Sequence, residues 1–213
     1  MLRKLFTLIV CLVAAVTTAS AQTPPDNEIW YTTTDGNVPE FFQKSYFRSI
    51  STYSNGKGII KLDDSIDIDY ILKNAFKNCS TLSSITLPKS ITSIVENMFL
   101  GCSSLRSITI PKSVTEIGEK AFSGCYHLES ITIPESVTKI GNAAFNGCGG
   151  KLIINCNIPN GYSVNDQLHY PLNGSRFTKI VFGKDVTRIG DYAFYNCFNG
   201  QDGISFAFPK NLK

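Results

Sequence analysis

The stretch LRSITIPKSVTEIGEKAFSGC, from Leu105 to Cys125, recurs with few changes as LESITIPESVTKIGNAAFNGC, from Leu128 to Cys148. The step between the two copies is 23 residues, and neighbouring units keep the same step. The cysteines and phenylalanines that follow it are Cys79, Cys102, Cys125 and Cys148, and Phe76, Phe99, Phe122 and Phe145. Self-similarity with a fixed step of about 20 to 29 residues predicts a solenoid in which each unit forms one turn.

Each unit predicts a strand, a return segment and a turn. The apolar residues at its start follow the spacing L-x-x-I-x-I, so that alternate side chains face inward, and a proline ends the strand because it has no amide hydrogen to donate. Val114 and Ile117 then bury a short second strand, and residues 119–122 are predicted to form a single helical turn. Together these elements predict an α/β leucine-rich-repeat solenoid with a parallel sheet and one continuous core.

The repeat continues in altered form downstream of Cys148. Phe194 and Cys197 restore the pattern 49 residues after Phe145 and Cys148. That interval is two units plus three extra residues, so residues 151–175 are predicted to form one degenerate unit. Its irregular loop, residues 160–173, is a candidate binding loop, because long loops in solenoids often carry function.

The solenoid is predicted to span residues 59–213, with the strand of its first unit at residues 60–62. Residues 204–213 contain only the strand half of a last unit, which predicts an exposed strand edge. Aromatic residues precede the repeats, and residues 22–58 are therefore predicted to form an N-terminal cap over the first unit.

The first 21 residues predict export. Arg3 and Lys4 precede an apolar run that is too short to cross a bilayer, and Ala19-Ser20-Ala21 has the small residues of a cleavage site. Residues 1–21 are therefore predicted to be a secretory signal peptide, and the protein to be secreted or held at the cell surface. No later segment is apolar for long enough to predict a transmembrane span.

Six cysteines follow the predicted signal peptide, which raises the possibility of disulfides. Equivalent cysteines of adjacent units would lie about one strand spacing apart, near 5 Å, but their side chains point the same way. We therefore expect a buried ladder of reduced thiols. Cys156 does not fit the repeat and is predicted to be the most exposed cysteine.

The composition offers little support for catalysis, metal binding or nucleic-acid binding. The 20 basic and 17 acidic residues leave a net charge of +3, without a basic stripe to neutralise phosphates. The two histidines, His127 and His169, are too few for a metal site, and the serines recur with the repeat instead of standing in a special turn. We expect a non-catalytic protein with no cofactor, no metal and no nucleic-acid partner.

The unit from Leu128 to Cys148 resembles the repeat of the BspA-like leucine-rich-repeat family, and the resemblance covers roughly residues 59–213. Residues 28–36, EIWYTTTDG, also resemble the leader of such repeats in surface proteins of Bacteroidetes. The resemblance implies a bacterial surface or secreted protein of a family linked to adhesion to host extracellular proteins and to other bacteria. It implies no catalytic residues.

The outward side chains of the predicted strands form the candidate binding face for a protein or glycan ligand. They alternate serine and threonine, with a variable charge before the strand serine. The residues are Ser84, Thr86, Arg106, Ser107, Thr109, Glu129, Ser130, Thr132 and Lys179. Hydroxyl side chains also suit any exposed parallel sheet, so a purely structural role for them stays open. The alternative function is assembly, in which the strand edge near residues 204–208 pairs with another chain as an oligomer contact.

Overall fold

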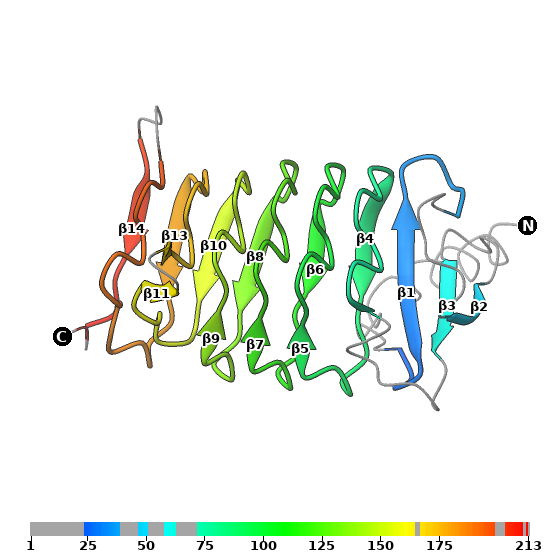
Figure 1. Cartoon of the computed structure of the whole chain (residues 1–213), viewed down its shortest axis with the longest axis horizontal. Helices are drawn as coiled ribbons and strands as arrows, with labels where there is room; N and C mark the ends of the chain where they lie inside the picture. The colour runs from blue at the N-terminus through cyan, green and yellow to red at the C-terminus, as the bar shows by residue number, and fades with distance from the viewer. Residues whose placement is uncertain are drawn as a thin grey trace, which may run out of the picture.

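The computed structural model describes residues 24–38, 47–50, 58–62, 72–164, 167–198, 203–210 and 212. Its strands stand side by side along the long axis of the molecule, with β1 to β3 near one end and β14 near the other (Figure 1). Nine of them form one sheet in the order β14-β13-β10-β8-β6-β4-β1-β3-β2. The predicted signal peptide, residues 1–21, lies outside the described residues.

Each repeat contributes one strand to the parallel part of this sheet. The strands are β4 (Leu82–Thr86), β6 (Ser107–Thr109), β8 (Ser130–Ile133), β10 (Lys151–Ile154), β13 (Lys179–Phe182) and β14 (Ser205–Ala207). Ile85 pairs with Ile108, and Ile131 with Leu152, so the buried residues of neighbouring units are in register. The observed architecture is a β-solenoid.

A second, smaller sheet closes another side of the solenoid. It consists of β5 (Ser93–Ile94), β7 (Glu116–Ile117) and β9 (Lys139–Ile140), which pair in parallel. The degenerate unit replaces a strand of this sheet with an isolated bridge between Ile158 and Ile189, and adds a hairpin of β11 (Tyr162–Val164) and β12 (Gln167–His169).

The N-terminal strands do not follow the predicted order. Strand β1 (Glu28–Thr33) lies between β3 (Gly58–Leu62) and β4, antiparallel to both, and β2 (Phe47–Ile50) pairs with β3. The prediction that residues 60–62 form the strand of the first unit in the parallel sheet is wrong, because they form β3, which β1 separates from β4. The position goes to β1 because it buries Ile29 and Tyr31 against the open end of the core. The cap boundary at residues 22–58 stays a prediction.

The core contains two ladders that run along the solenoid axis. The rings of Phe76, Phe99, Phe122 and Phe145 stack at centroid distances of 5.3, 5.3 and 5.4 Å. Beside them, the thiols of Cys102, Cys125 and Cys148 donate to the carbonyls of Phe76, Phe99 and Phe122 at 3.0, 3.3 and 3.0 Å. Each thiol thus bridges two units, which gives a buried polar group a partner.

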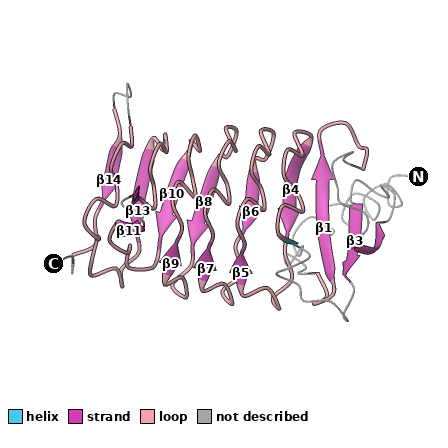
Figure 2. Cartoon of the chain, in the orientation of Figure 1, coloured by secondary structure: helices cyan, strands magenta, loops and turns pink. Residues whose placement is uncertain are grey.

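The predicted single helical turns are not formed, and residues 119–122 are turns instead (Figure 2). Lys120 has a φ of 51°, and the equivalent residues Asn97 and Ala143 have φ values of 57° and 50°. A positive φ cannot continue a right-handed helix. The amides of Lys120 and Phe122 donate to the carbonyls of the next unit, those of Asn142 and Ala144, rather than within their own turn. The α/β class is therefore corrected to a β-solenoid.

Candidate binding face and groove

The hydroxyls of the predicted binding face form two rows across the sheet. Ser84 pairs with Ser107, which pairs with Ser130, and Thr86 pairs with Thr109. The side chains on β6 and β8 are exposed, whereas those on β4 are half-buried, because β1 lies beside β4. The hydroxyl of Thr32 on β1 lies 2.8 Å from that of Ser83 and 2.6 Å from that of Ser84. The accessible part of the two hydroxyl rows is therefore on β6 and β8.

The rows change character beyond β8. Lys151 and Lys179 take the places of the serines, and Ile153 and Val181 take those of the threonines. Lys179 is exposed. The face thus carries hydroxyl groups on β6 and β8, and lysine and aliphatic side chains on β10 and β13.

The two charged residues before the strand serines bind each other. The Arg106 Nη1 lies 3.2 Å from the Glu129 Oε1, and both side chains are exposed. An exposed pair of this kind contributes about 0–1 kcal/mol to stability. Its consequence for binding is that the two charges largely offset each other on this face.

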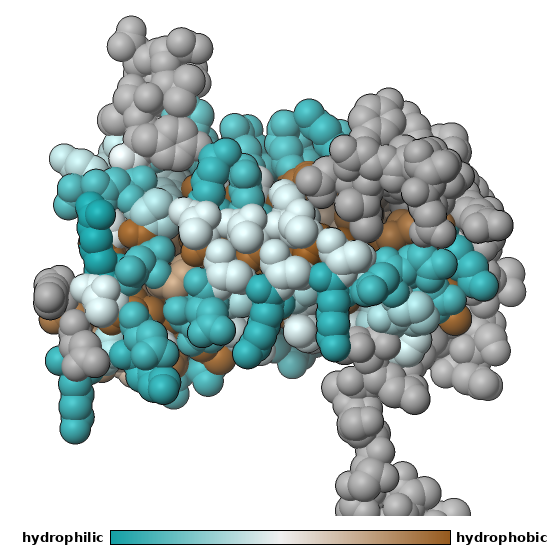
Figure 3. Space-filling model, turned by 90° about the horizontal axis from the view of Figure 1, so that it is seen from below, coloured by the Kyte–Doolittle hydropathy of each residue, from teal (hydrophilic) through white to brown (hydrophobic). Residues whose placement is uncertain are grey.

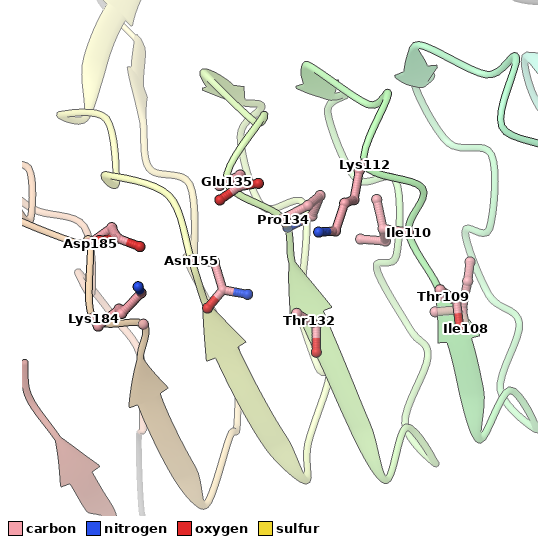
Figure 4. A pocket seen from close by; sticks show the side chains of 11 residues that line it. Ile108, Thr109, Ile110, Lys112, Thr132, Pro134, Glu135, Asn155, Lys184 and Asp185 are labelled. Atoms are coloured by element: carbon pink, nitrogen blue, oxygen red, sulfur yellow. The ribbon is translucent and has the colours of Figure 1, made fainter.

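A groove of about 470 Å³ lies where strands β6, β8, β10 and β13 end. The residues that line it are Ile108, Thr109, Ile110, Lys112, Thr132, Pro134, Glu135, Asn155, Gly183, Lys184 and Asp185. Lys112 and Asn155 extend toward the space beside Pro134, and Lys184 and Asp185 border its other end (Figure 4). Of the nine predicted face residues, the groove includes Thr109 and Thr132.

A shortened turn in the degenerate unit explains the groove. In regular units the isoleucine of the return segment stands seven positions after the last inward residue of the strand, as Ile140 does after Ile133. In the degenerate unit Ile158 stands only four positions after Ile154. The turn that elsewhere projects beyond the strands is therefore truncated. Its neighbours, which carry Glu135 and Lys184, become the walls of a gap with Asn155 between them.

The groove also has a distinct charge pattern. Lys112 and Lys184 contribute ammonium groups and Glu135 and Asp185 contribute carboxylates, and none of the four forms an ion pair with another described residue. The amide of Asn155 and the hydroxyls of Thr109 and Thr132 add uncharged donors and acceptors. This set suits hydrogen bonding to a polar ligand, and the lining includes neither histidine nor cysteine.

The side that carries β5, β7 and β9 differs in how its charges are arranged. Its lysines bind adjacent glutamates, with Lys139 Nζ 2.6 Å from Glu116 Oε1, and Lys120 Nζ 2.8 Å from Glu119 Oε1. Seen from below the view of Figure 1, strongly hydrophilic residues border a band of residues with intermediate hydropathy, and hydrophobic surface shows in small patches (Figure 3). The lysines beside β5, β7 and β9 are thus ion-paired, whereas Lys112 and Lys184 in the groove form no ion pair with a described residue.

The sequence analysis missed several residues of the groove and misplaced one cysteine. Lys112, Glu135, Asn155, Lys184 and Asp185 lie in turns and connections, whereas the predicted face consists of strand residues and their neighbours. The signal that could have found them is the shortened spacing between Ile154 and Ile158.

Cys156 is buried, with 4% of its surface exposed, so the prediction that it is the most exposed cysteine is wrong. The shortened turn draws it under the chain, and burial raises its pKa to about 11. Cys197 is the half-buried one. His127 is exposed, with its Nδ1 2.6 Å from the Ser103 carbonyl oxygen.

Other functional signs were sought in the described part of the chain. There, no three His, Cys, Asp or Glu side chains come together as a possible metal site. Over the same residues, no helix has the length and hydrophobicity that crossing a membrane requires.

Comparison with known proteins places the repeats in a family. The BspA type leucine rich repeat region matches residues 69–201, with six copies. None of the curated proteins matches the chain.

Two solved structures are similar. A leucine-rich repeat protein from Bacteroides ovatus is 24% identical, with a TM-score of 0.46, over 87% of this chain and 53% of that one. This chain thus spans about half the length of that protein. A leucine-rich repeat protein of T. pallidum is 23% identical, with a TM-score of 0.38, over 62% of this chain and 71% of that one. The six matched repeats, over residues 69–201, show that the chain belongs to the BspA-type leucine-rich repeat family.

Proposed function

We propose that this protein is a non-catalytic binding protein, secreted or held at the cell surface, that recognises a protein or glycan through its sheet face and groove. The observation that carries the proposal is the groove, where side chains from four units surround about 470 Å³ in an otherwise regular solenoid. A concave site with a few convergent polar groups is the usual form of a binding site. The predicted signal peptide and the family support a location outside the cytoplasm.

The groove and the hydroxyl rows supply different parts of the recognition. Thr109 and Thr132 belong to both, so a ligand in the groove can extend along the exposed rows of β6 and β8. Lys112 and Lys184 offer charged donors to acidic groups, and Asn155 offers both a donor and an acceptor. Adhesion to a host protein, a glycan or another cell is the role that we propose for this surface.

An array of immobilised matrix proteins, mucins and glycans tests this function. We expect saturable binding to at least one of them by the full chain. The paired change Lys112→Ala with Lys184→Ala should weaken that binding at least tenfold. The paired change Lys73→Ala with Lys139→Ala, on the side where the lysines bind glutamates, is the matched control and should leave it unchanged. The proposal is contradicted if nothing on the array is bound, or if the control variant loses as much affinity as the groove variant.

A second candidate function is assembly through β14. Phe206 and Phe208 are 41% and 57% exposed, although the equivalent residues one unit earlier, Ile180 and Phe182, are buried. Among the described strands, β14 pairs only with β13. An exposed strand edge with apolar side chains favours pairing with a second copy of the chain.

Light scattering over a range of protein concentrations tests this candidate. Association through β14 predicts that the measured mass rises with protein concentration to that of a defined oligomer. The change Phe206→Ser with Phe208→Ser should raise the concentration at which half of the protein is associated at least tenfold. A monomeric mass at every concentration would contradict it.

A further inference from the structure

Three tyrosines pack together where the degenerate unit meets the last complete repeat. The ring centroids of Tyr170 and Tyr195 lie 4.2 Å apart in a stacked arrangement, and Tyr192 lies 6.0 Å from Tyr170 and 6.4 Å from Tyr195. Tyr170 is buried beneath the other two, whose exposed fractions are 67% for Tyr192 and 51% for Tyr195. The three rings therefore form a supported aromatic surface, here called the tyrosine platform.

The solenoid does not require tyrosine at these positions. Asn97, Lys120 and Ala143 occupy the position of Tyr192 in earlier units, and Ser123 and Asn146 occupy that of Tyr195. Tyr170 follows the hairpin of β11 and β12, which earlier units lack. Departures from the repeat thus bring three aromatic rings together at a single place on the surface.

Tyr192 stands at a turn position that is left-handed in the earlier units as well. Its φ is 57°, and the equivalent residues Asn97, Lys120 and Ala143 have φ values of 57°, 51° and 50°. The repeat therefore sets the backbone at this position. What distinguishes this unit is the tyrosine side chain that the turn presents to solvent.

Polar residues flank the two exposed tyrosines in the chain. Asp191 precedes Tyr192 and is exposed, and its amide donates to the Asn160 Oδ1 at 2.9 Å. The Asn160 Oδ1 also accepts from the Arg188 Nη2 at 2.9 Å. Beyond Tyr195, the Asn196 Nδ2 donates to the Asn173 Oδ1 at 3.1 Å. Asp191 and Asn196 therefore adjoin the exposed tyrosines in the chain, and Asn160 links Arg188 to the backbone of Asp191.

We propose that the tyrosine platform is a second binding site, which takes a neutral saccharide. The exposed faces of Tyr192 and Tyr195 stack against the C–H face of a pyranose ring, because an aromatic face carries negative charge density that attracts polarised hydrogens. Asp191, Arg188 and Asn196 are placed to hydrogen-bond the hydroxyls at the edge of that ring. The aromatic rings suit the apolar face of such a ligand, and the polar side chains suit its hydroxyl rim.

Two other ligand classes fit less well. A quaternary ammonium needs a space enclosed by ring faces, but Tyr170 and Tyr195 stack directly on each other at 4.2 Å. A specific protein interface buries about 800 Å² on each partner with an apolar centre. The tyrosine platform is a few side chains wide and is bordered by charged and amide groups.

The platform lies in the turns that connect the second strand to the next sheet strand, not on the sheet face. The inference is therefore independent of the groove. Variants at each site separate their contributions.

Affinity electrophoresis of the full chain in native gels that contain dextran, xylan, mannan or a mixed-linkage β-glucan tests the inference. We expect at least one polysaccharide to slow the protein. The change Tyr192→Ala with Tyr195→Ala should weaken that interaction at least tenfold. Tyr126→Ala is the matched control, since Tyr126 is a tyrosine with 62% exposure outside the platform, and it should bind as the unchanged protein does.

Three results would overturn the inference. The first is that none of the four polysaccharides slows the protein. The second is that the Tyr192→Ala with Tyr195→Ala variant is slowed as much as the unchanged protein. The third is that Tyr126→Ala loses as much of the interaction as the double tyrosine variant. Loss of matrix-protein binding in the platform variant, with no polysaccharide bound, would assign the tyrosines to a protein partner and would also overturn it. Circular dichroism spectra that match the unchanged protein establish that each variant is folded.

Discussion

The side-chain oxygen of Asn155 packs against the α-carbon of Gly183, so closely that a β-carbon at residue 183 would overlap it. Both residues stand where earlier units have a proline, and both use the amide that proline lacks. The Asn155 amide donates to the Ile133 carbonyl at 3.0 Å, and the Gly183 amide donates to the Ile154 carbonyl at 2.7 Å. These two bonds extend the ladder between strands beyond its usual end, directly under the groove.

Gly183→Ala should therefore act through Asn155. The added methyl group must displace the Asn155 side chain, and we expect a loss of about 1 kcal/mol in the free energy of unfolding. In an Asn155→Ala background the same change should cost less, because the overlapping oxygen is gone and the α-carbon of residue 155 is the contact that remains. Urea unfolding of the two single variants and the double variant measures this coupling, and additive losses would contradict the contact.

Phe122→Ala should be among the most destabilising single changes in the core. Phe122 is fully buried between Phe99 and Phe145, with centroids at 5.3 and 5.4 Å. Removing a buried ring of this size lowers the free energy of unfolding by about 3–5 kcal/mol. Phe122→Leu, which leaves less empty volume, is the control and should lose less. Equal losses in urea unfolding would show that the ring stack does not contribute as described.

Ala143→Gly should stabilise the protein, which is the reverse of the usual effect. Ala143 has a φ of 50°, and glycine adopts that conformation without steric strain. We expect a gain of about 0.5–1 kcal/mol. Ala121→Gly is the matched control, since Ala121 is a buried turn residue without a positive φ, and it should destabilise. A loss of stability in both variants would contradict the backbone conformation at Ala143.

Stability should fall as the pH rises above 9. Burial raises the pKa of Cys79 to about 12 and that of Cys156 to about 11, from an ordinary value of 9.0. Between about pH 9 and pH 11 the unfolded chain releases thiol protons that the folded chain keeps, so unfolding becomes more favourable. Each such thiol contributes about 1.4 kcal/mol per pH unit at most. Urea unfolding from pH 8 to 10.5 should show the decline, and Cys156→Ala should reduce its slope. An unchanged slope in that variant would contradict the burial of the Cys156 thiol in the folded protein.

Much of the fold could be predicted from the repeat, because stacked units reproduce a sequence step directly. Phe122 and Cys125 recur with that step, and their ladders lie where the step implies. The helical turn failed because hydrogen bonds to the next unit compete with local helix formation, and a left-handed residue such as Lys120 carries no mark in the sequence. The position of β1 depends on long-range pairing with Ile85, which the repeat does not encode.

The binding surface was less predictable for a related reason. Alternation in the strands identified Thr109 and Thr132, but the walls of the groove come from turns of units that are not adjacent in sequence. Glu135 and Lys184 are 49 residues apart and face the same gap only because the turn at Asn155 is short. The tyrosine platform likewise depends on packing between Tyr170 and Tyr195, which sequence spacing alone does not show.

Closing the groove tests the central claim most directly. Replacing residues 155–157 with the six residues at 111–116 restores the regular seven-residue spacing between Ile154 and Ile158. It adds a turn where the gap now lies. The measurement is the affinity of this variant, beside the unchanged chain and Gly183→Ala, for the matrix protein, mucin or glycan that the array identifies.

The variant with the six-residue replacement is here called the filled variant. We predict that it folds, as circular dichroism and a cooperative urea transition would show, and that its affinity is at least tenfold weaker. Gly183→Ala alters the groove without lengthening the turn, so it should lose affinity to a smaller extent. It provides the test if the filled variant does not fold. Unchanged affinity in a folded filled variant, or in Gly183→Ala if that variant alone is folded, would contradict the assignment of the groove as the binding site.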